Sequence, residues 1–141
     1  MISGVAPLAA DARQTAGVLL LALLAVEWGG AFLARTVGGQ QPQTALQQSF
    51  HRAGHAHAGV LVVLGLVCQL LLSSTDLEGV WRAIARSGVP LAAVLMPAGF
   101  FLAVTGNGTE RPNRAIALVW VGSASLAAGV TALGVGLLVA D

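Results

Sequence analysis

Charged residues are scarce in this chain. They make up 9% of its 141 residues, while hydrophobic residues make up 56%. An ordinary soluble domain has about a quarter of its residues charged. Because so few ionised groups cannot cover a soluble globule, the composition predicts an integral membrane protein.

Cysteine, lysine and tyrosine are also rare or absent. Cys68 is the only cysteine, so the chain can form no internal disulfide and no thiolate metal site of its own. All seven basic residues are arginines and they are scattered singly, unlike the clustered basic face of a nucleic-acid-binding protein. Aromatic residues make up only 5%, too few for the girdles of a membrane β-barrel. We therefore expect no nucleic-acid partner, and helices rather than strands.

Four apolar segments are present, at 15–34, 52–72, 88–104 and 114–140. Each is close to the roughly 20 helical residues that cross a hydrocarbon core. The first segment has no convincing small-residue cleavage site after it, so we interpret it as a retained span rather than a signal peptide. The pattern predicts an all-α, integral membrane four-helix bundle. We expect a single domain over 1–141, in the lipid bilayer of a bacterial cell.

The connections between these segments alternate between two sides. Side A holds the loops 36–50 and 105–113, and side B holds the loop 73–87, in which Trp81 suggests a short interfacial helix. Side A carries four arginines and side B three, a bias that leaves the membrane orientation open. In the third segment, Pro97 lacks an N–H and should free a backbone carbonyl.

Three histidines, His51, His55 and His57, open the second segment, and the chain has no others. At about 100° per residue, His51 and His55 lie roughly 40° apart on one helix face, and His57 points nearly away from His55. Two histidines at i and i+4 can both reach one metal ion. This spacing makes all three histidines candidate metal ligands on side A.

Glu27 is a carboxylate within the first segment, where such groups are costly and usually face the bundle interior. Its depth is close to that of His55 and His57, so we include it among the candidate metal ligands. Gly29 and Gly30, one turn away, could admit a partner helix or a flat ring. A plainer alternative is that the histidines hydrogen-bond to loop carbonyls and glutamine side chains, while Glu27 pairs with one of two arginines, Arg52 or Arg114.

The stretch from Arg52 to His57 resembles the second helix of the nitric-oxide-reductase-like branch of haem-copper oxidase catalytic subunits, in which Arg-x-x-His-Thr-Asn opens a membrane helix. Four-helix membrane proteins with a His-x-His variant look similar. The resemblance implies that His55 is an axial ligand of haem b, that Arg52 lies near the propionates and that His51 is a candidate co-ligand. Because no histidine follows His57, one chain cannot supply the oxidase dinuclear site. A bis-histidine haem would need a homo-oligomer, a membrane partner subunit or both ligands from the cluster.

These features leave three hypotheses for function. The first is binding of haem b or of a transition-metal ion, copper, zinc or iron, for electron transfer or for metal or haem handling. The second is a proton or metal transport relay of Glu27 and the histidines. The third is a non-catalytic accessory subunit that packs through small-residue pairs such as Ala25 with Gly29 and Ser125 with Gly129, although packing within the chain is the simpler explanation of those pairs. No complete catalytic constellation is present in the single chain.

Overall fold

The computed structural model describes residues 8–37 and 42–140. It contains four α-helices, which are α1 (Ala10–Val37), α2 (Ala45–Leu72), α3 (Gly79–Ala103) and α4 (Ala117–Val139), and a 3₁₀ turn, η1 (Arg114–Ile116), leads into α4. All four are long and apolar enough to cross a membrane. The predicted all-α bundle with four membrane spans is thereby confirmed.

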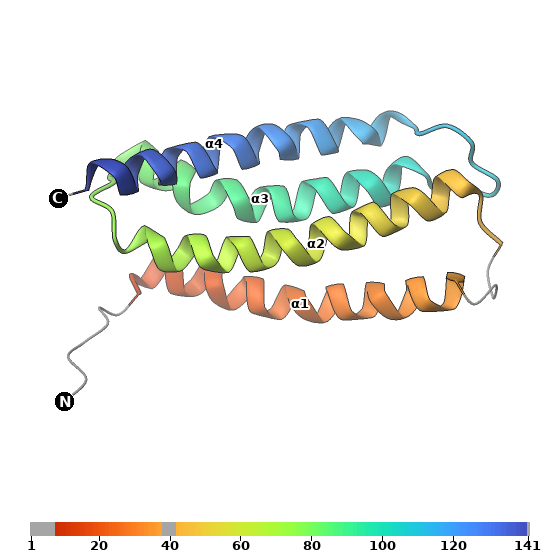
Figure 1. Cartoon of the computed structure of the whole chain (residues 1–141), viewed down its shortest axis with the longest axis horizontal. Coiled ribbons are helices and arrows are strands. Elements are labelled where there is room, and N and C mark those ends of the chain that lie inside the picture. The colour runs from red at the N-terminus through yellow and green to blue at the C-terminus, as the bar shows by residue number, and fades with distance from the viewer. Residues whose placement is uncertain (1–7, 38–41, 141) are drawn as a thin grey trace.

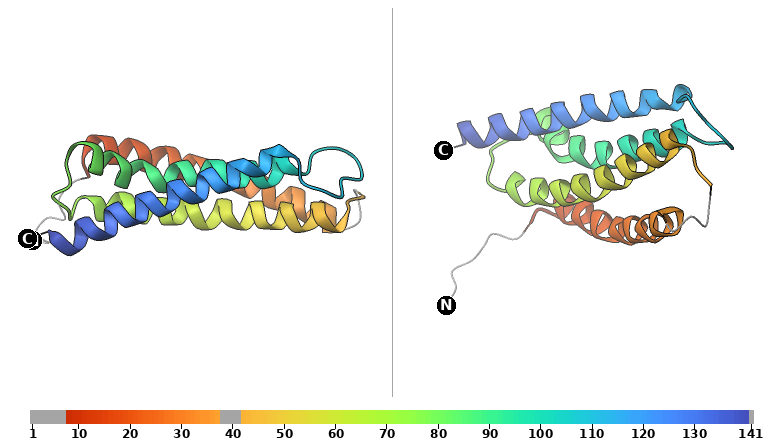
Figure 2. Two further views of the ribbon diagram at one scale, coloured as in Figure 1. Left: turned by 90° about the horizontal axis from the view of Figure 1, so that it is seen from above. Right: turned by 45° about the vertical axis from the view of Figure 1, so that its right-hand side comes forward.

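The helices run antiparallel to one another in the order of the sequence (Figure 1). α1 packs against α2, α2 against α3, and α3 against α4, while no contact joins α1 to α4 across the described helices. In Figure 1 and in the right-hand view of Figure 2, α1 and α4 lie at opposite edges of the arrangement. The bundle is therefore open, and α1 has a neighbour mainly on one side.

The closest helix contact joins α3 and α4 through glycines. A Cβ atom built on Gly88 would lie 2.5 Å from the Cα atom of Gly129, which leaves no room for a side chain. The Ser125 hydroxyl donates a hydrogen bond to the Gly88 carbonyl at 2.9 Å. The pair Ser125 and Gly129 therefore packs within the chain, as close helix contacts through small residues do in membranes.

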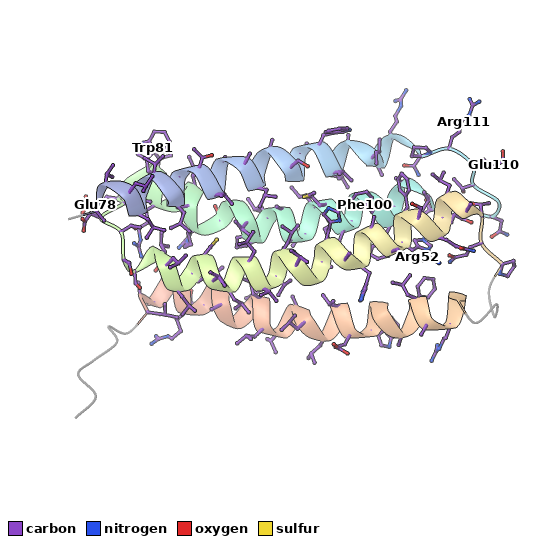
Figure 3. All side chains as sticks on the ribbon, viewed as in Figure 1. Arg52, Glu78, Trp81, Phe100, Glu110 and Arg111 are labelled. Carbon is purple, nitrogen blue, oxygen red and sulfur yellow. The ribbon has the colours of Figure 1, made fainter. Side chains whose placement is uncertain are left out.

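The third helix begins earlier than the predicted span, at Gly79 instead of residue 88. Trp81, which we expected in a separate interfacial helix, belongs to the first turn of α3 and is 62% exposed (Figure 3). That expectation was wrong because hydropathy marks only the apolar part of a helix, whereas backbone hydrogen bonding continues into the polar part.

Pro90 and Pro97 both lie inside α3, so neither can donate to the carbonyl one turn before it. The carbonyl freed by Pro90 belongs to Arg86, and the side chain of Gln69 in α2 donates to it at 2.9 Å. Gln69 is fully buried, and its Oε1 atom has no hydrogen-bond partner among the residues described. A side chain of α2 thus takes the place of the missing backbone donor in α3.

On side B, Asp11 at the start of α1 forms ion pairs with two arginines of α3. Its carboxylate lies 3.0 Å from Arg86 and 3.7 Å from Arg82. These are the ion pairs found within residues 8–37 and 42–140. They connect α1 to α3 at the end of the bundle opposite the histidines.

Candidate functional site

The start of α2, which carries the histidines, is fixed by two polar residues. The Thr44 hydroxyl accepts from the Gln47 backbone N–H at 3.2 Å, and the Gln47 side-chain oxygen accepts from the Thr44 N–H at 3.0 Å. This is a capping box, which satisfies backbone donors at a helix start. This capping box was not predicted, although Thr-x-x-Gln is its recognisable signal in the sequence.

Gln47 also joins α2 to the end of α3. Its side-chain nitrogen donates to the carbonyl oxygens of Val104 at 3.1 Å and Gly106 at 2.7 Å, and the Thr44 hydroxyl donates to Thr109 at 2.7 Å. Gln47 is 8% exposed. The first turns of α2 are therefore held against α3 and the following loop, which places the histidines at the junction of α1, α2 and α3.

His51 lies between two aromatic rings from different helices. The centroid of its ring is 5.7 Å from that of Phe32 in α1 and 5.6 Å from that of Phe101 in α3. Its Nδ1 atom lies 3.3 Å from the side-chain oxygen of Gln43, in hydrogen-bond geometry. Because the amide oxygen can only accept, this bond leaves Nε2 available. A hollow of about 350 Å³, bordered by His51, Phe32, Phe101 and Gly29, opens beside the ring.

His55 lies against the two adjacent glycines of α1. A Cβ atom built on Gly30 would lie 3.3 Å from Cε1 of His55, and one built on Gly29 would lie 3.5 Å from Nδ1. The flat ring that approaches this glycine pair is thus the imidazole of His55 itself. No hydrogen bond to that imidazole is present among the described residues, and a hollow of about 220 Å³ with Gly29, Pro97 and Phe101 in its walls adjoins it.

His57 faces another part of the bundle. Its Nδ1 atom donates to the Ala53 carbonyl at 2.7 Å, since a carbonyl oxygen can only accept. The ring lies 5.0 Å from the ring of Phe100, which Figure 3 labels on α3. The structure therefore brings His51 and His55 to one side of α2 and places His57 on another.

Glu27 and Arg52 are both exposed in the single chain. Neither residue forms an ion pair with any other described residue, so the expected alternative of Glu27 with Arg52 or Arg114 is not present. No carboxylate oxygen lies within 4 Å of a histidine ring nitrogen in residues 8–37 and 42–140. The structure thus does not bring Glu27 to the histidines, although their depths are similar.

In the described part of the chain, no group of three or more histidine, cysteine, aspartate or glutamate residues is placed to hold a metal ion. What the structure assembles is a pair, His51 and His55, at two hollows that share Gly29 and Phe101 in their walls. The contribution of Phe32 and Phe101 was not predicted, because an aromatic residue in an apolar span carries no signal of its own.

Comparison with known proteins gives no further assignment. No protein-family model, curated protein or solved structure matches the chain. The resemblance of the stretch from Arg52 to His57 to an oxidase helix therefore depends on those residues alone.

Proposed function

We propose that this polytopic membrane protein binds a transition-metal ion through His51 and His55 on side A. The observation that carries the proposal is the placement of both imidazoles at two adjoining hollows between α1, α2 and α3. Neutral imidazole is a ligand for copper, zinc and iron. The hydrogen bond from His51 to Gln43 supports this role, because ligating histidines commonly use their other ring nitrogen in such a bond.

The hollows suit an ion better than a haem. The one beside His55 has a volume of about 220 Å³, below the roughly 300–1,000 Å³ of typical small-molecule pockets, and the one beside His51, at about 350 Å³, is near the lower end of that range. The glycine pair that could admit a macrocycle is covered by the ring of His55. Haem b would require α1 to move away from α2, because the His55 ring already lies against Gly29 and Gly30. An ion would take its remaining ligands from water or from a second chain.

The test is metal uptake by the purified protein in detergent, measured by elemental analysis together with an absorption spectrum after loading with copper or zinc. We expect one ion per site, and we expect His55→Ala and His51→Ala each to abolish stoichiometric binding. His57→Ala is the matched control and should bind as the wild type does, because His57 faces Phe100 on another side of α2.

Three results would contradict the proposal. They are no uptake by the wild type, unchanged uptake by His55→Ala, or loss of uptake in His57→Ala alone. A Soret band in the absorption spectrum would mean that the site binds haem instead of an ion.

A proton relay has less support, since Glu27 is exposed and does not contact a histidine in the described structure.

A further inference from the structure

Glu27 lies inside a membrane span and yet is exposed in the single chain. It is eight residues from Arg35 at the end of the span, or roughly 12 Å at 1.5 Å per residue. Ionisable side chains at such depth almost always face a bundle interior or a water-filled cavity, because lipid solvates charge poorly. Its exposure therefore indicates a surface that is covered by something besides this chain's own helices.

Arg52 lies on the same flank of the molecule as Glu27. Gly29 lines a hollow with residues of α3, and Gly54 packs against Phe101 of α3. Glu27 precedes Gly29 by two residues, and Arg52 precedes Gly54 by two residues. Two residues correspond to about 160° around a helix, so both charged side chains point away from α3.

Each of the two charged residues is also one helical turn from the contact between α1 and α2. Glu27 is three residues before Gly30, and Arg52 is three residues before His55, whose ring lies on Gly30. Figure 3 shows Arg52 in the first turns of α2. Together they form what we call the outer flank, a surface of the α1 and α2 pair with one negative and one positive residue.

α1 is also the least covered of the four helices. Only 6% of its most apolar 18-residue window is buried, compared with 28–44% for the other three. Trp28, next to Glu27, is 84% exposed. The outer flank thus combines an edge helix, a large exposed aromatic residue and two charges without an ion-pair partner among the described residues.

We propose that the outer flank is an interface at which a second copy of this chain binds. A two-fold axis along the membrane normal keeps both copies in the same orientation and makes the interface self-complementary. Glu27 of each copy then meets Arg52 of the other, so the two charges are paired twice. The two residues differ in depth by about six residues, or about 9 Å, which the long arginine side chain can cover by extending along apolar surface.

The test uses two differently tagged copies that are expressed together in one membrane, solubilised in mild detergent and captured through one tag. We expect wild-type copies to capture each other. Glu27→Arg in both copies, or Arg52→Glu in both copies, should reduce capture about tenfold or more, because like charges then face each other in the interface.

The decisive sample combines a Glu27→Arg copy with an Arg52→Glu copy. Across a two-fold interface each altered residue then meets the opposite charge, so capture should return to near the wild-type level. If instead the two residues pair within one chain, each copy has like charges of its own and capture stays low.

Several controls keep this test falsifiable. Glu110→Arg changes an exposed charge in the loop 105–113, outside the outer flank, and should not affect capture. Circular dichroism would reveal whether the Glu27→Arg variant folds poorly. Glu27→Gln removes the charge with little change of shape, so it should weaken capture even in that case. His55→Ala should leave capture intact, so failure of the metal site is separate from failure of this interface.

Absence of capture between wild-type copies would overturn the proposal, as would a mixed sample no better than the single variants. In the latter case, Glu27 meets Arg52 of its own chain. If Arg52→Glu alone had no effect, its guanidinium would bind lipid headgroups and not a second copy.

Discussion

The imidazole of His55 and the backbone of α1 depend on each other at the level of single residues. A Cβ atom at Gly29 would make ordinary contact with the ring at 3.5 Å, whereas one at Gly30 would lie only 3.3 Å from it. Protein interiors are close-packed, so a group added at this point displaces the ring instead of adding to the contact. The position of the proposed ligand therefore depends on the absence of a side chain at Gly30.

Gly30→Leu should displace the His55 ring and lower both metal uptake and stability. We expect a loss of about 1–3 kcal/mol in the free energy of unfolding, as for other overpacked contacts. Gly17→Leu is the matched control, since a Cβ atom at Gly17 meets no described atom within 4 Å. Both variants gain the same helix propensity, so their difference isolates the contact with His55. Unfolding in mixed detergent, followed by circular dichroism, measures it, and equal stability of the two variants would contradict the expectation.

At the scale of elements, one side chain in α2 compensates for a proline in α3. Gln69 donates to the Arg86 carbonyl that Pro90 leaves without a backbone donor. No side chain in the described part of the chain donates to the corresponding carbonyl of Ala93, one turn before Pro97. The two prolines therefore differ in whether a side chain replaces the missing backbone donor, and the effect of this difference on stability can be measured.

Gln69→Leu should cost about 1–3 kcal/mol of stability, because the partly buried Arg86 carbonyl loses its donor. Adding Pro90→Ala restores an N–H that can donate to the Arg86 carbonyl, so the double variant should lose clearly less than the sum of the single variants. A double-mutant cycle measured by detergent unfolding isolates this coupling. Pro97→Ala is the control and should show no coupling to Gln69→Leu. Additive effects in both cycles would mean that Gln69 does not serve the Arg86 carbonyl.

The helices themselves could be predicted from the sequence, since apolar runs of sufficient length have few other solutions in a membrane. The helix neighbours could not be predicted, because runs that are apolar all round do not show which face meets which helix. Glu27 shows the consequence. The general tendency of carboxylates places it in the bundle interior, but the structure places α1 at an edge and Glu27 on its exposed flank.

The candidate site was also predictable only in part, because helix periodicity can be read from the sequence and helix neighbours cannot. The separation of His51 and His55 from His57 follows from helix periodicity within α2 and needs no knowledge of its neighbours. The contacts of His55 with Gly30 and of His51 with Phe32 depend on how α1 lies against α2. Information of that kind is distributed over the whole helix pair.

At the scale of the whole molecule, the open row of helices fixes which loops share a membrane side. The shortest helix, α4, has 23 residues, or about 35 Å at 1.5 Å per residue, and a hydrocarbon core is about 30 Å thick. Each helix can therefore cross completely. The loop after α2 and the loop after α3 lie at opposite ends of the bundle in Figure 1.

This arrangement predicts opposite labelling of two engineered cysteines. In a Cys68→Ala background, Ser74→Cys lies in the loop after α2 and Asn107→Cys in the loop after α3, and both positions are exposed. A membrane-impermeant maleimide added to intact cells should label one variant only, and both after the membrane is permeabilised. Labelling of both from outside would mean that α3 does not cross. The variant that reacts in intact cells also gives the orientation, which the near balance of arginines on the two sides leaves open. It thereby shows from which side of the membrane an ion would reach His51 and His55.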